Sequence, residues 1–434
     1  MTAELIFVGT ELLLGDILNT NAQFLSQQLA AAGISVLHQC VVGDNAERLA
    51  EALKLALSRS DLVLTTGGLG PTKDDLTKEV AAEVCGLELE LHKESLAAMK
   101  RFFASKGLGM PQSNEKQAYL PKGAVVFENT NGTAPGCAME TGGKWVLLLP
   151  GPPREMKTMF TLSALPFLRR FSESVLVSHT VRTFGIGESA MAERVSDLLD
   201  HKNPTVAPYA KNGEALLRIT AKAENEAAAE ALLSPVICEI KTRLHDVIYG
   251  TDVSGLEDAA VALLKEKHLT VATAESATAG LIAKRLTDIA GASEVFHCGI
   301  VSYSNDIKAR LLGVSEETLK EQSAVCKDVA AQMALGALRQ SNARIAVSIT
   351  GLAGPGKDDR GRDAGLAHLA LTDGETICHK EVHTGHSEAD CRDYNRTVFA
   401  SHALHLIYRY AAAYPAKPDG GEPLNKNERK ERTE

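Results

Sequence analysis

The chain has 434 residues, of which 44% are apolar, and its formal net charge is −9. A chain of this length exceeds what one hydrophobic core organises, so we expect roughly two to four domains. The acidic balance excludes a general electrostatic attraction to nucleic acid or to an anionic membrane. Apolar runs such as residues 259–264 are far shorter than the roughly 18 residues of a membrane span.

The cysteines and the first residues indicate a reducing compartment. Eight cysteines are scattered singly, without a C-x-x-C pair or a spacing that builds a zinc site. Met1 leads directly into a strand-like run, and no secretion signal is recognised. We therefore expect a cytoplasmic protein with free thiols and no membrane partner.

In chain order, strand-like apolar runs first alternate with helical periods, which is typical of an α/β fold with a parallel sheet. The strands are expected at residues 4–8, 35–41 and 62–66 and near 144–153, and the helices at 21–32, 47–58 and 76–84. These elements predict a first domain over residues 1–170.

The next segment has a different order of strand and helix patterns. Strand patterns lie at 175–184 and 216–222, and helical patterns lie at 189–199 and 224–233. This order predicts a small α+β module over residues 171–250. Strand, helix and strand then alternate again until a long helix at 389–412, which predicts an α/β domain over 251–414. Residues 415–434 are polar and rich in charge and turn formers, so a disordered tail is expected.

Glycine-rich loops follow the strands of the first domain. The sequence T-T-G-G-L-G-P-T-K-D-D ends the strand at 62–66, and glycines there let a backbone approach a phosphate. Further turns near Asn131 and Gly151 should reach the same edge of the sheet. The candidate phosphate contacts are therefore Gly67, Gly68, Asn131 and Gly151.

Two aspartates at the end of this loop need a counter-charge if a phosphate binds there. A divalent cation such as Mg, Mn or Co would supply it, since hard cations prefer carboxylate oxygens. Asp74 and Asp75 are therefore candidate metal ligands, with Glu11 as an additional one. The alternative is that acids in a first helical turn complement the helix dipole and bind nothing, and the residues alone leave both open.

In the third domain, a short apolar strand at 269–273 delivers Glu275 and Ser276 to its carboxyl end. Neither G-x-S-x-G nor S-x-x-K surrounds this serine, so the usual serine motifs lack support. Tyr303 and Lys308 stand five apart where a strand passes into a helix. A lysine whose pKa is lowered by burial can act as the base for a hydroxyl nucleophile.

We hypothesise that Ser276 is a nucleophile and that Lys308 with Tyr303 transfers protons. Thr350, with adjacent N–H groups, would stabilise the tetrahedral oxyanion. The alternatives are a helix cap for Ser276, a core position for Tyr303 and a solvated position for Lys308. Further candidate substrate contacts are Glu275, Thr278, Gly280, Gly351, Gly354 and Arg392. The charged insert K-D-D-R-G-R-D at 357–363 acts either as a lid or as a surface loop.

Several longer motifs carry a specific resemblance. They are V-G-T-E-L-L-L-G-D-I-L-N-T-N, T-G-G-L-G-P-T-K-D-D-L-T, N-G-T-A-P-G, L-P-G-P-P-R-E-M, F-G-I-G-E-S, A-E-S-A-T-A-G, Y-S-N-D-I-K and T-G-L-A-G-P-G. Together they are highly specific, and the chain resembles the CinA family over all but its tail. Arg392 and Arg396 also resemble an arginine pair in the last helix of that family, which favours Arg392 as a phosphate partner.

The resemblance implies a first domain of the molybdopterin-binding-protein type that hydrolyses ADP-ribose with a divalent metal, and a KH-like middle module. It also implies a C-terminal amidohydrolase that converts nicotinamide mononucleotide to nicotinate mononucleotide and ammonia, without a cofactor. The expected partners are small nucleotides and a second copy of the chain in a homodimer. The middle module lacks a G-x-x-G clamp and is acidic in balance, so no nucleic-acid partner is expected.

The chain departs from the family pattern at positions that bear on activity. The usual E-S-C-T-G-G reads E-S-A-T-A-G here, so Ala277 replaces cysteine and Ala279 replaces glycine. The added methyl of Ala279 is expected to be poorly tolerated if the backbone there needs a positive φ. Two other functions stay open, namely a molybdopterin-handling protein and a non-catalytic partner in competence or DNA-damage responses.

Overall fold

The computed structural model describes residues 1–171, 175–211 and 213–415. Apart from its first residue, the tail predicted at 415–434 lies outside the described residues. The described chain clusters into two compact units, one made of Met1–Ser178 with Thr220–Ser234 and the other of His179–Ile219 with the residues from 235 onward. No helix in the described parts of the chain has the length and apolar character needed to cross a bilayer.

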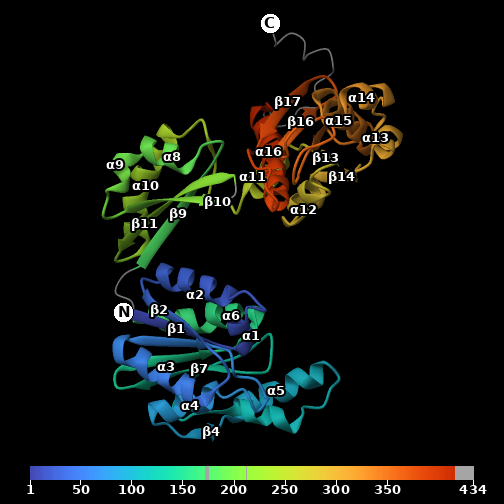
Figure 1. Ribbon diagram of the computed structural model, residues 1–434. Helices are drawn as coiled ribbons and strands as arrows, with labels where there is room; N and C mark the ends of the chain where they lie inside the picture. Colours follow the sequence, from blue (N-terminus) through green and yellow to red (C-terminus); the bar gives the residue numbers. More distant parts are fainter. Residues whose placement is uncertain (172–174, 212, 416–434) are drawn as a thin grey trace. The chain divides into compact units, whose positions relative to one another are not determined.

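The N-terminal sheet has six strands in the order β2-β1-β3-β8-β7-β6. Figure 1 labels β2, β1 and β7 of this sheet. The strands are β1 Thr2–Val8, β2 Ser35–Val42, β3 Leu62–Thr66, β6 Val125–Phe127, β7 Gly136–Thr141 and β8 Lys144–Leu149. The first four in this order are parallel, as predicted. β7 pairs antiparallel with β8, and β6 pairs antiparallel with β7. The link between β7 and β8 is only Gly142 and Gly143, both with positive φ, and so short a turn joins only antiparallel neighbours.

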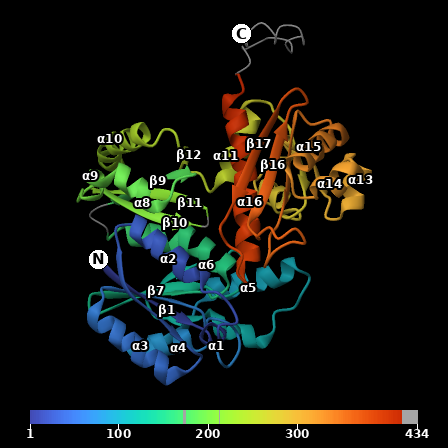
Figure 2. The same cartoon turned by 45° about the horizontal axis from the view of Figure 1, so that its top comes forward.

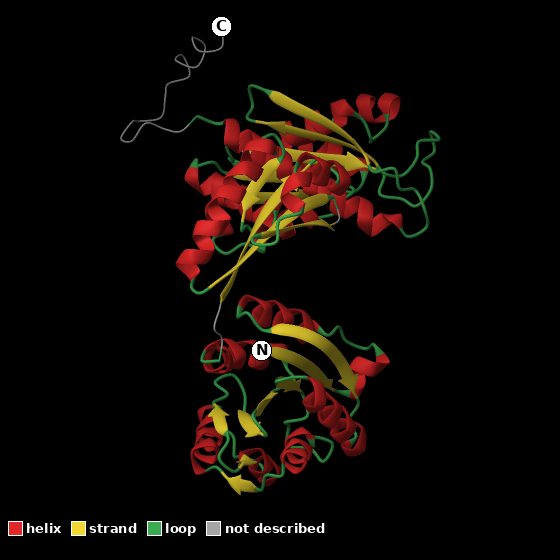
Figure 3. Ribbon diagram, turned by 90° about the vertical axis from the view of Figure 1, so that its left-hand side faces the viewer, coloured by secondary structure: helices red, strands yellow, loops and turns green. Residues whose placement is uncertain are grey.

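Helices cover both faces of this sheet (Figure 3). The helices are α1 Thr10–Leu14, α2 Thr20–Ala31, α3 Ala46–Arg59, α4 Thr77–Cys85, α5 Lys93–Ser105, α6 Pro153–Met159 and α7 Leu165–Arg169. Shorter elements are the 3-10 helix Gln112–Ala118, the π-helix Phe160–Ala164 and the paired strands β4 Leu89–Leu91 and β5 Tyr119–Pro121. Leu25 of α2 and Met156 of α6 pack on one face, and Leu49 of α3 and Val80 of α4 pack on the other.

The middle module contains a four-stranded sheet in the order β10-β11-β9-β12. Its elements are β9 Val175–Phe184, α8 Glu188–Arg194, α9 Ser196–Leu199, β10 Thr205–Lys211, β11 Glu214–Ala223, α10 Glu226–Arg243 and β12 Ile248–Thr251. The predicted α+β fold class of this module is confirmed, but β10 and β12 were not predicted. The helix predicted at 189–199 is two short helices, because Val195 between them has a φ of −126°, outside the helical range.

The C-terminal sheet has the order β14-β13-β15-β16-β17. Its strands are β13 Val271–Glu275, β14 Phe296–Val301, β15 Ile345–Gly351, β16 Leu366–Thr372 and β17 Ile377–His383. The first three strands in this order are parallel, and β16 and β17 are antiparallel additions. The carboxyl ends of the three parallel strands therefore meet at one edge, where ligand sites of α/β sheets usually lie.

Helices also cover both faces of the C-terminal sheet. They are α11 Leu256–Glu266, α12 Leu281–Thr287, α13 Asn305–Leu312, α14 Glu316–Gln322, α15 Lys327–Ser341 and α16 Cys391–Ala413, with a 3-10 turn at Ala292–Glu294. Figure 2 shows β16 and β17 between α16 and α15. Phe399 of α16 and Ile282 of α12 pack with Val347 on one face, whereas Met333 of α15 packs with Ala272 on the other.

Candidate active site

A cavity of about 300 Å³ opens where β13, β14 and β15 end. The four side chains predicted as catalytic all line it, together with the 351–358 loop that follows β15: Ser276, Tyr303, Lys308 and Thr350. These residues are up to 74 positions apart in the chain, and the parallel strands bring them to one place. The remaining wall is formed by the segment before α15 and by the first turn of α16.

Ser276 follows β13 directly and is 8% exposed. Its backbone N–H donates to the carbonyl of Ile349 at 3.0 Å, which fixes the start of the loop against β15. Gly280, rather than Ser276, is the N-cap of α12, and as a glycine it has no side chain that could accept the cap hydrogen bond. The alternative of a capping role for Ser276 is therefore wrong, and the serine is located at the cavity.

Lys308 is 1% exposed, so the alternative of a solvated position is wrong. Its Nζ donates to the backbone carbonyl of Tyr303 at 3.0 Å. Burial lowers the pKa of this ammonium from its ordinary value to about 8, because a buried site disfavours the charged form. A fraction of the amine is then neutral near pH 7, and a neutral amine can accept a proton.

Tyr303 and Arg392 form the outer wall of the cavity. The Tyr303 side chain is 59% exposed, so it is not a core residue. Arg392 donates through Nη2 to the Tyr303 hydroxyl at 3.0 Å and through Nη1 to the Gly354 carbonyl at 2.7 Å. A guanidinium has five N–H donors, so these two bonds leave donors for a bound anion.

Thr350 is oriented differently from the prediction. Its hydroxyl donates to the carbonyl of Ala324 at 2.7 Å. A hydroxyl has one proton, and a carbonyl oxygen can only accept. The Thr350 hydroxyl therefore has no proton left for an oxyanion in this geometry, and the predicted oxyanion role of that hydroxyl is corrected.

Two glycines of the predicted set are required by packing at the cavity. A Cβ atom on Gly351 would lie 2.7 Å from the Cβ of Ala367, and one on Gly354 would lie 2.6 Å from the Cys391 sulfur. Gly354 also has a φ of +92°. Asn395, which the sequence analysis missed, is fully buried and donates through Nδ2 to the Ala353 carbonyl at 3.0 Å, so it holds this loop. Its position one helical turn after Arg392 was the available signal.

Three predicted substrate contacts lie away from the cavity. Both carboxylate oxygens of Glu275 accept from the backbone N–H groups of Gly280, Ile282 and Ala283 at 2.9–3.0 Å, so this side chain caps α12. The Gly280 N–H is used in the same contact. Thr278 is fully buried, and its carbonyl accepts from Arg396 at 2.9 Å. The predictions for Glu275 and Gly280 are wrong because both groups are used in the cap of α12. Thr278 does not line the cavity, but its hydroxyl is buried without a hydrogen-bond partner among the described residues, so its role in binding stays a prediction.

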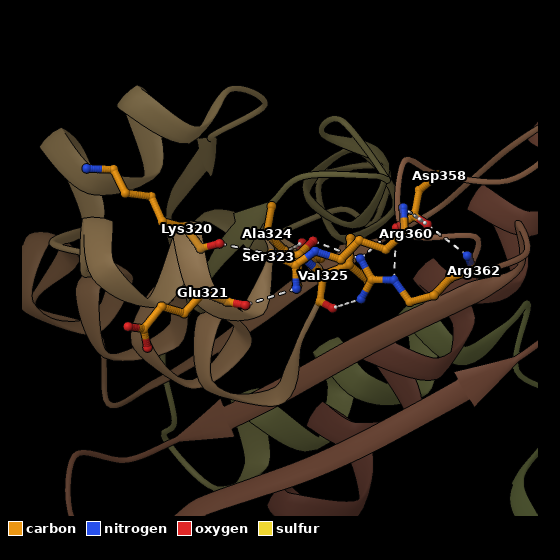
Figure 4. Close-up of polar contacts among 9 residues, drawn as sticks. Lys320, Glu321, Ser323, Ala324, Val325, Asp358, Arg360 and Arg362 are labelled. Atoms are coloured by element: carbon orange, nitrogen blue, oxygen red, sulfur yellow. Dashed lines mark hydrogen bonds and ion pairs between the residues drawn. The ribbon is translucent and has the colours of Figure 1, made fainter.

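The charged insert is a wall of the cavity, and Lys357 and Asp358 are among its lining residues. Figure 4 shows that Arg360 reaches the last turn of α14 and that Arg362 reaches the residues that follow this helix. Arg360 donates to the carbonyls of Lys320 and Glu321, each at 3.0 Å. We call residues 357–363 the strap. These contacts show that the insert is not an unattached surface loop, and a lid role stays a prediction.

The glycine loops of the N-terminal sheet also meet at one edge. The Gly67 N–H donates to the Leu149 carbonyl at 3.1 Å. A Cβ atom on Gly67 would lie 2.1 Å from the Val8 carbonyl oxygen, and one on Gly151 would lie 3.3 Å from the Gly67 Cα. The ends of β1, β3 and β8 thus approach too closely for larger residues. Gly68, with a φ of +66°, follows in the same turn.

The predicted metal ligands are not brought together. Asp75 folds back on its own loop, accepting from the Thr72 N–H at 2.9 Å and the Thr72 hydroxyl at 2.5 Å. Asp74 and Glu11 are exposed, and α4 begins only at Thr77. Within residues 1–171, 175–211 and 213–415, no three His, Cys, Asp or Glu side chains form a group that could hold a metal ion. These carboxylates therefore do not fit a preassembled cation site.

Asn131 and Asn21 differ in what they contact at this edge. The Asn131 amide donates to the Thr158 hydroxyl at 2.8 Å, so it ties its loop to α6. Asn21, which was not predicted, is 7% exposed and donates to the Gly151 carbonyl at 2.8 Å. Among the described residues, its Oδ1 and the hydroxyl of Thr77 are buried without a hydrogen-bond partner. Such groups are rare in folded proteins, and a bound water, ion or polar ligand would supply the missing partner.

Known proteins are similar to this chain over most of its length. A putative competence-damage inducible protein of Clostridium perfringens is 50% identical over 372 residues, which cover 86% of this chain and 90% of that protein. The chain belongs to the CinA family. The CinA C-terminal domain model matches residues 253–411, the damage-inducible protein CinA KH domain model matches 178–250, and the probable molybdopterin binding domain model matches 4–170.

Other CinA relatives extend the match. A CinA-like protein of Desulfovibrio desulfuricans is 47% identical over 418 residues, covering 96% of this chain and 98% of the relative. A solved CinA structure from Thermoplasma acidophilum, described as of unknown function, is 38% identical and covers 37% of this chain and 95% of its own, with a TM-score of 0.35.

Proposed function

We propose that the C-terminal domain hydrolyses the carboxamide of nicotinamide mononucleotide to nicotinate mononucleotide and ammonia. The observation that carries the proposal is the fully buried Lys308, whose pKa falls to about 8, in the same cavity as the hydroxyl of Ser276. Burying an ammonium is costly, and a lysine beside a hydroxyl is a recurring arrangement for nucleophile activation.

In the proposed reaction, the Ser276 oxygen attacks the amide carbon while neutral Lys308 accepts the hydroxyl proton. The tetrahedral intermediate then collapses with loss of ammonia, whose nitrogen receives the proton from Lys308. Water attacks the resulting serine ester, gives a proton to Lys308 and releases the carboxylic acid, and Ser276 regains its proton. Each proton taken up by the lysine is returned, so the cycle consumes one water and no cofactor.

The oxyanion is assigned to the backbone in this proposal. Ala277 follows the nucleophile and lines the cavity. No hydrogen-bond partner of its N–H is found in the described parts of the chain. A backbone donor next to a nucleophile is the usual partner of a developing oxyanion. Arg392, at the mouth of the cavity, is proposed to bind the phosphate of the nucleotide.

An ammonia-release assay on nicotinamide mononucleotide tests the proposal. We expect turnover by the wild type, and losses of at least about 10³-fold in Ser276→Ala and of about 10²-fold or more in Lys308→Met. Full activity in Ser276→Ala would defeat the covalent mechanism. Absence of turnover by the wild type would defeat the function itself and favour a non-catalytic role in competence or DNA-damage responses.

We also propose that the N-terminal domain binds and hydrolyses ADP-ribose with a divalent metal. The unpartnered buried groups of Asn21 and Thr77, beside the Gly67–Gly68 turn, support a polar ligand at this edge. Because the carboxylates do not form a cation site by themselves, no catalytic step is assigned to the metal.

Hydrolysis of ADP-ribose with and without a chelator, and in Asp75→Ala and Asn21→Ala, tests this second proposal. Chelator-resistant hydrolysis would remove the metal from the proposal. Binding of a pterin in place of ADP-ribose would favour a molybdopterin-handling role. A homodimer is proposed for the whole chain, and sedimentation velocity measures it.

A further inference from the structure

The hydrogen bond of the Thr350 hydroxyl indicates which kind of ligand group this oxygen can bind. Thr350 is the penultimate residue of β15, is 1% exposed and lines the cavity. Its single proton is donated to the Ala324 carbonyl at 2.7 Å. What remains on that oxygen is lone-pair density, so toward a ligand the hydroxyl is an acceptor.

Arg362 of the strap binds the two residues on either side of Ala324 (Figure 4). Arg362 donates through Nη2 to the Ser323 hydroxyl at 2.7 Å and through Nη1 to the Val325 carbonyl at 2.6 Å. The two residues that flank Ala324 are therefore fixed by one guanidinium. Ser323 also has a φ of +80°, a conformation that a non-glycine residue keeps only when its surroundings impose it.

Arg362 is itself anchored. Its Nε and Nη2 donate to one carboxylate oxygen of Asp358 at 2.8 and 2.6 Å, while the other oxygen accepts the backbone N–H groups of Arg360 and Arg362. The Asp358 side chain is only 10% exposed. A planar guanidinium with two bonds to one carboxylate oxygen and two more to Ser323 and Val325 has little freedom. The strap therefore fixes the segment that carries the Ala324 carbonyl, which accepts the Thr350 proton.

We propose that Thr350 accepts a hydrogen bond from the N–H of the substrate's carboxamide, and that Arg362 is the positioning residue that keeps Thr350 an acceptor. This inference rests on the proposed amide hydrolysis. A carboxamide has two N–H donors on its nitrogen, whereas the carboxylate product has none and presents only lone pairs. At Thr350 the amide is therefore favoured over the carboxylate product, which has no N–H to donate to this oxygen.

The experiment measures binding without turnover. In full-length Ser276→Ala protein, calorimetry gives the dissociation constants of nicotinamide mononucleotide and nicotinate mononucleotide, and their ratio is the selectivity for the amide. Thr350→Val removes the acceptor at nearly constant shape, and we expect the selectivity to fall about fivefold to tenfold. Thr350→Ser keeps the hydroxyl and should keep the selectivity. Thr350→Ala is a second variant that removes the acceptor, and circular dichroism checks that each protein is folded.

The two arginines of the strap form a matched pair for the positioning role. Arg362→Met should lower the selectivity, because the Ala324 carbonyl loses its support. Arg360→Met should not, because its bonds end on the Lys320 and Glu321 carbonyls, which are not cavity residues. An equal effect of both variants would remove the positioning role.

The outcomes separate the inference from the function on which it rests. If both nucleotides bind but Thr350→Val and Thr350→Ala leave their ratio unchanged, Thr350 is only structural and the inference is overturned. If neither nucleotide binds to the Ser276→Ala protein, the proposed amide hydrolysis fails, and the inference fails with it.

Discussion

Ala279 holds a backbone conformation that alanine rarely adopts. Its φ is +50°, in the left-handed region where a Cβ atom costs roughly 1 kcal/mol or more. The sequence analysis expected such strain if this position of E-S-A-T-A-G needed a positive φ, and that condition is confirmed. Glycine relieves the strain but makes the unfolded chain freer, so the two effects partly cancel.

We predict that Ala279→Gly raises the free energy of unfolding by up to about 1 kcal/mol. Urea denaturation of the full chain measures the change. Ala277→Gly in the same loop is the control, since Ala277 is not among the residues with positive φ. It should lose stability by about 0.5–1 kcal/mol. A lower free energy of unfolding in both variants would show that the strain at Ala279 is negligible.

From the pKa of Lys308 we predict how kcat/KM for amide hydrolysis depends on pH. Burial lowers the pKa of its ammonium from 10.5 to about 8. The base is the neutral amine, whose fraction rises with pH, so kcat/KM for amide hydrolysis should increase from pH 6 and level off above about pH 9. The measured inflection should lie near pH 8 rather than near the ordinary value of 10.5.

Two variants test the assignment of that inflection. Lys308→Arg stays protonated at every accessible pH and should remove the inflection together with most of the activity. Lys320→Met changes a lysine that is 79% exposed on α14 and should leave the profile unchanged. An unshifted inflection in Lys308→Arg would assign the titration to another group.

At the level of elements, α12 depends on a carboxylate outside it. The helix has only seven residues, and Glu275 at the end of β13 accepts three backbone N–H groups around its first turn. A glutamine at this position would place the N–H groups of its side-chain amide against the backbone N–H groups at the start of α12. We predict that Glu275→Gln lowers the free energy of unfolding by about 1–3 kcal/mol.

Hydrogen exchange at the amides of Ile282 and Ala283 locates the effect, because loss of the cap should speed exchange there first. Glu316→Gln is the control. Glu316 is also an acid in the first turn of a helix, but its side chain is 77% exposed, and we expect a change below about 0.5 kcal/mol. Equal exchange rates in Glu275→Gln and wild type would mean that α12 is held by packing alone.

The same elements show what periodicity can and cannot predict. The strands β1, β2 and β3 lie within two residues of their predicted bounds, because apolar strand-like runs alternate clearly with helical periods there. β10 contains Pro208, and β12 is a four-residue strand containing Gly250, so both lack the usual strand signal. The Gly142 and Gly143 turn was the one missed cue to the antiparallel edge.

The candidate site was also predicted only in part. The strand-end positions of Ser276 and Thr350, the spacing of Tyr303 and Lys308 and the family resemblance together predicted the residues that line the cavity. Side-chain direction was not predictable. The Thr350 proton is taken by Ala324, 26 positions away, and Glu275 turns to α12 because free helix N–H groups lie closer than the cavity.

At the level of the molecule, the second compact unit joins part of the middle module to the C-terminal domain. Phe184, the last residue of β9, is 3% exposed and belongs to the same hydrophobic cluster as Phe399 of α16. Its ring lies 4.9 and 4.5 Å from the imidazole centroids of His402 and His405. Burial lowers the pKa of both imidazoles to about 4, so they are neutral at pH 7 and pack as aromatic groups.

We predict that Phe184→Ala lowers the free energy of unfolding of this unit by about 3–5 kcal/mol, as expected for a buried phenylalanine. Water entering the vacated space would favour the charged imidazoles, so the pKa of His405 should rise from about 4 toward the ordinary 6.5. Calorimetry and NMR titration measure the two effects. Tyr209→Ala, which removes a 44% exposed aromatic ring from β10 of the same module, should change neither. If Phe184→Ala behaved like Tyr209→Ala, the middle module would contribute nothing to the core of the C-terminal domain, and the two would be separate folding units.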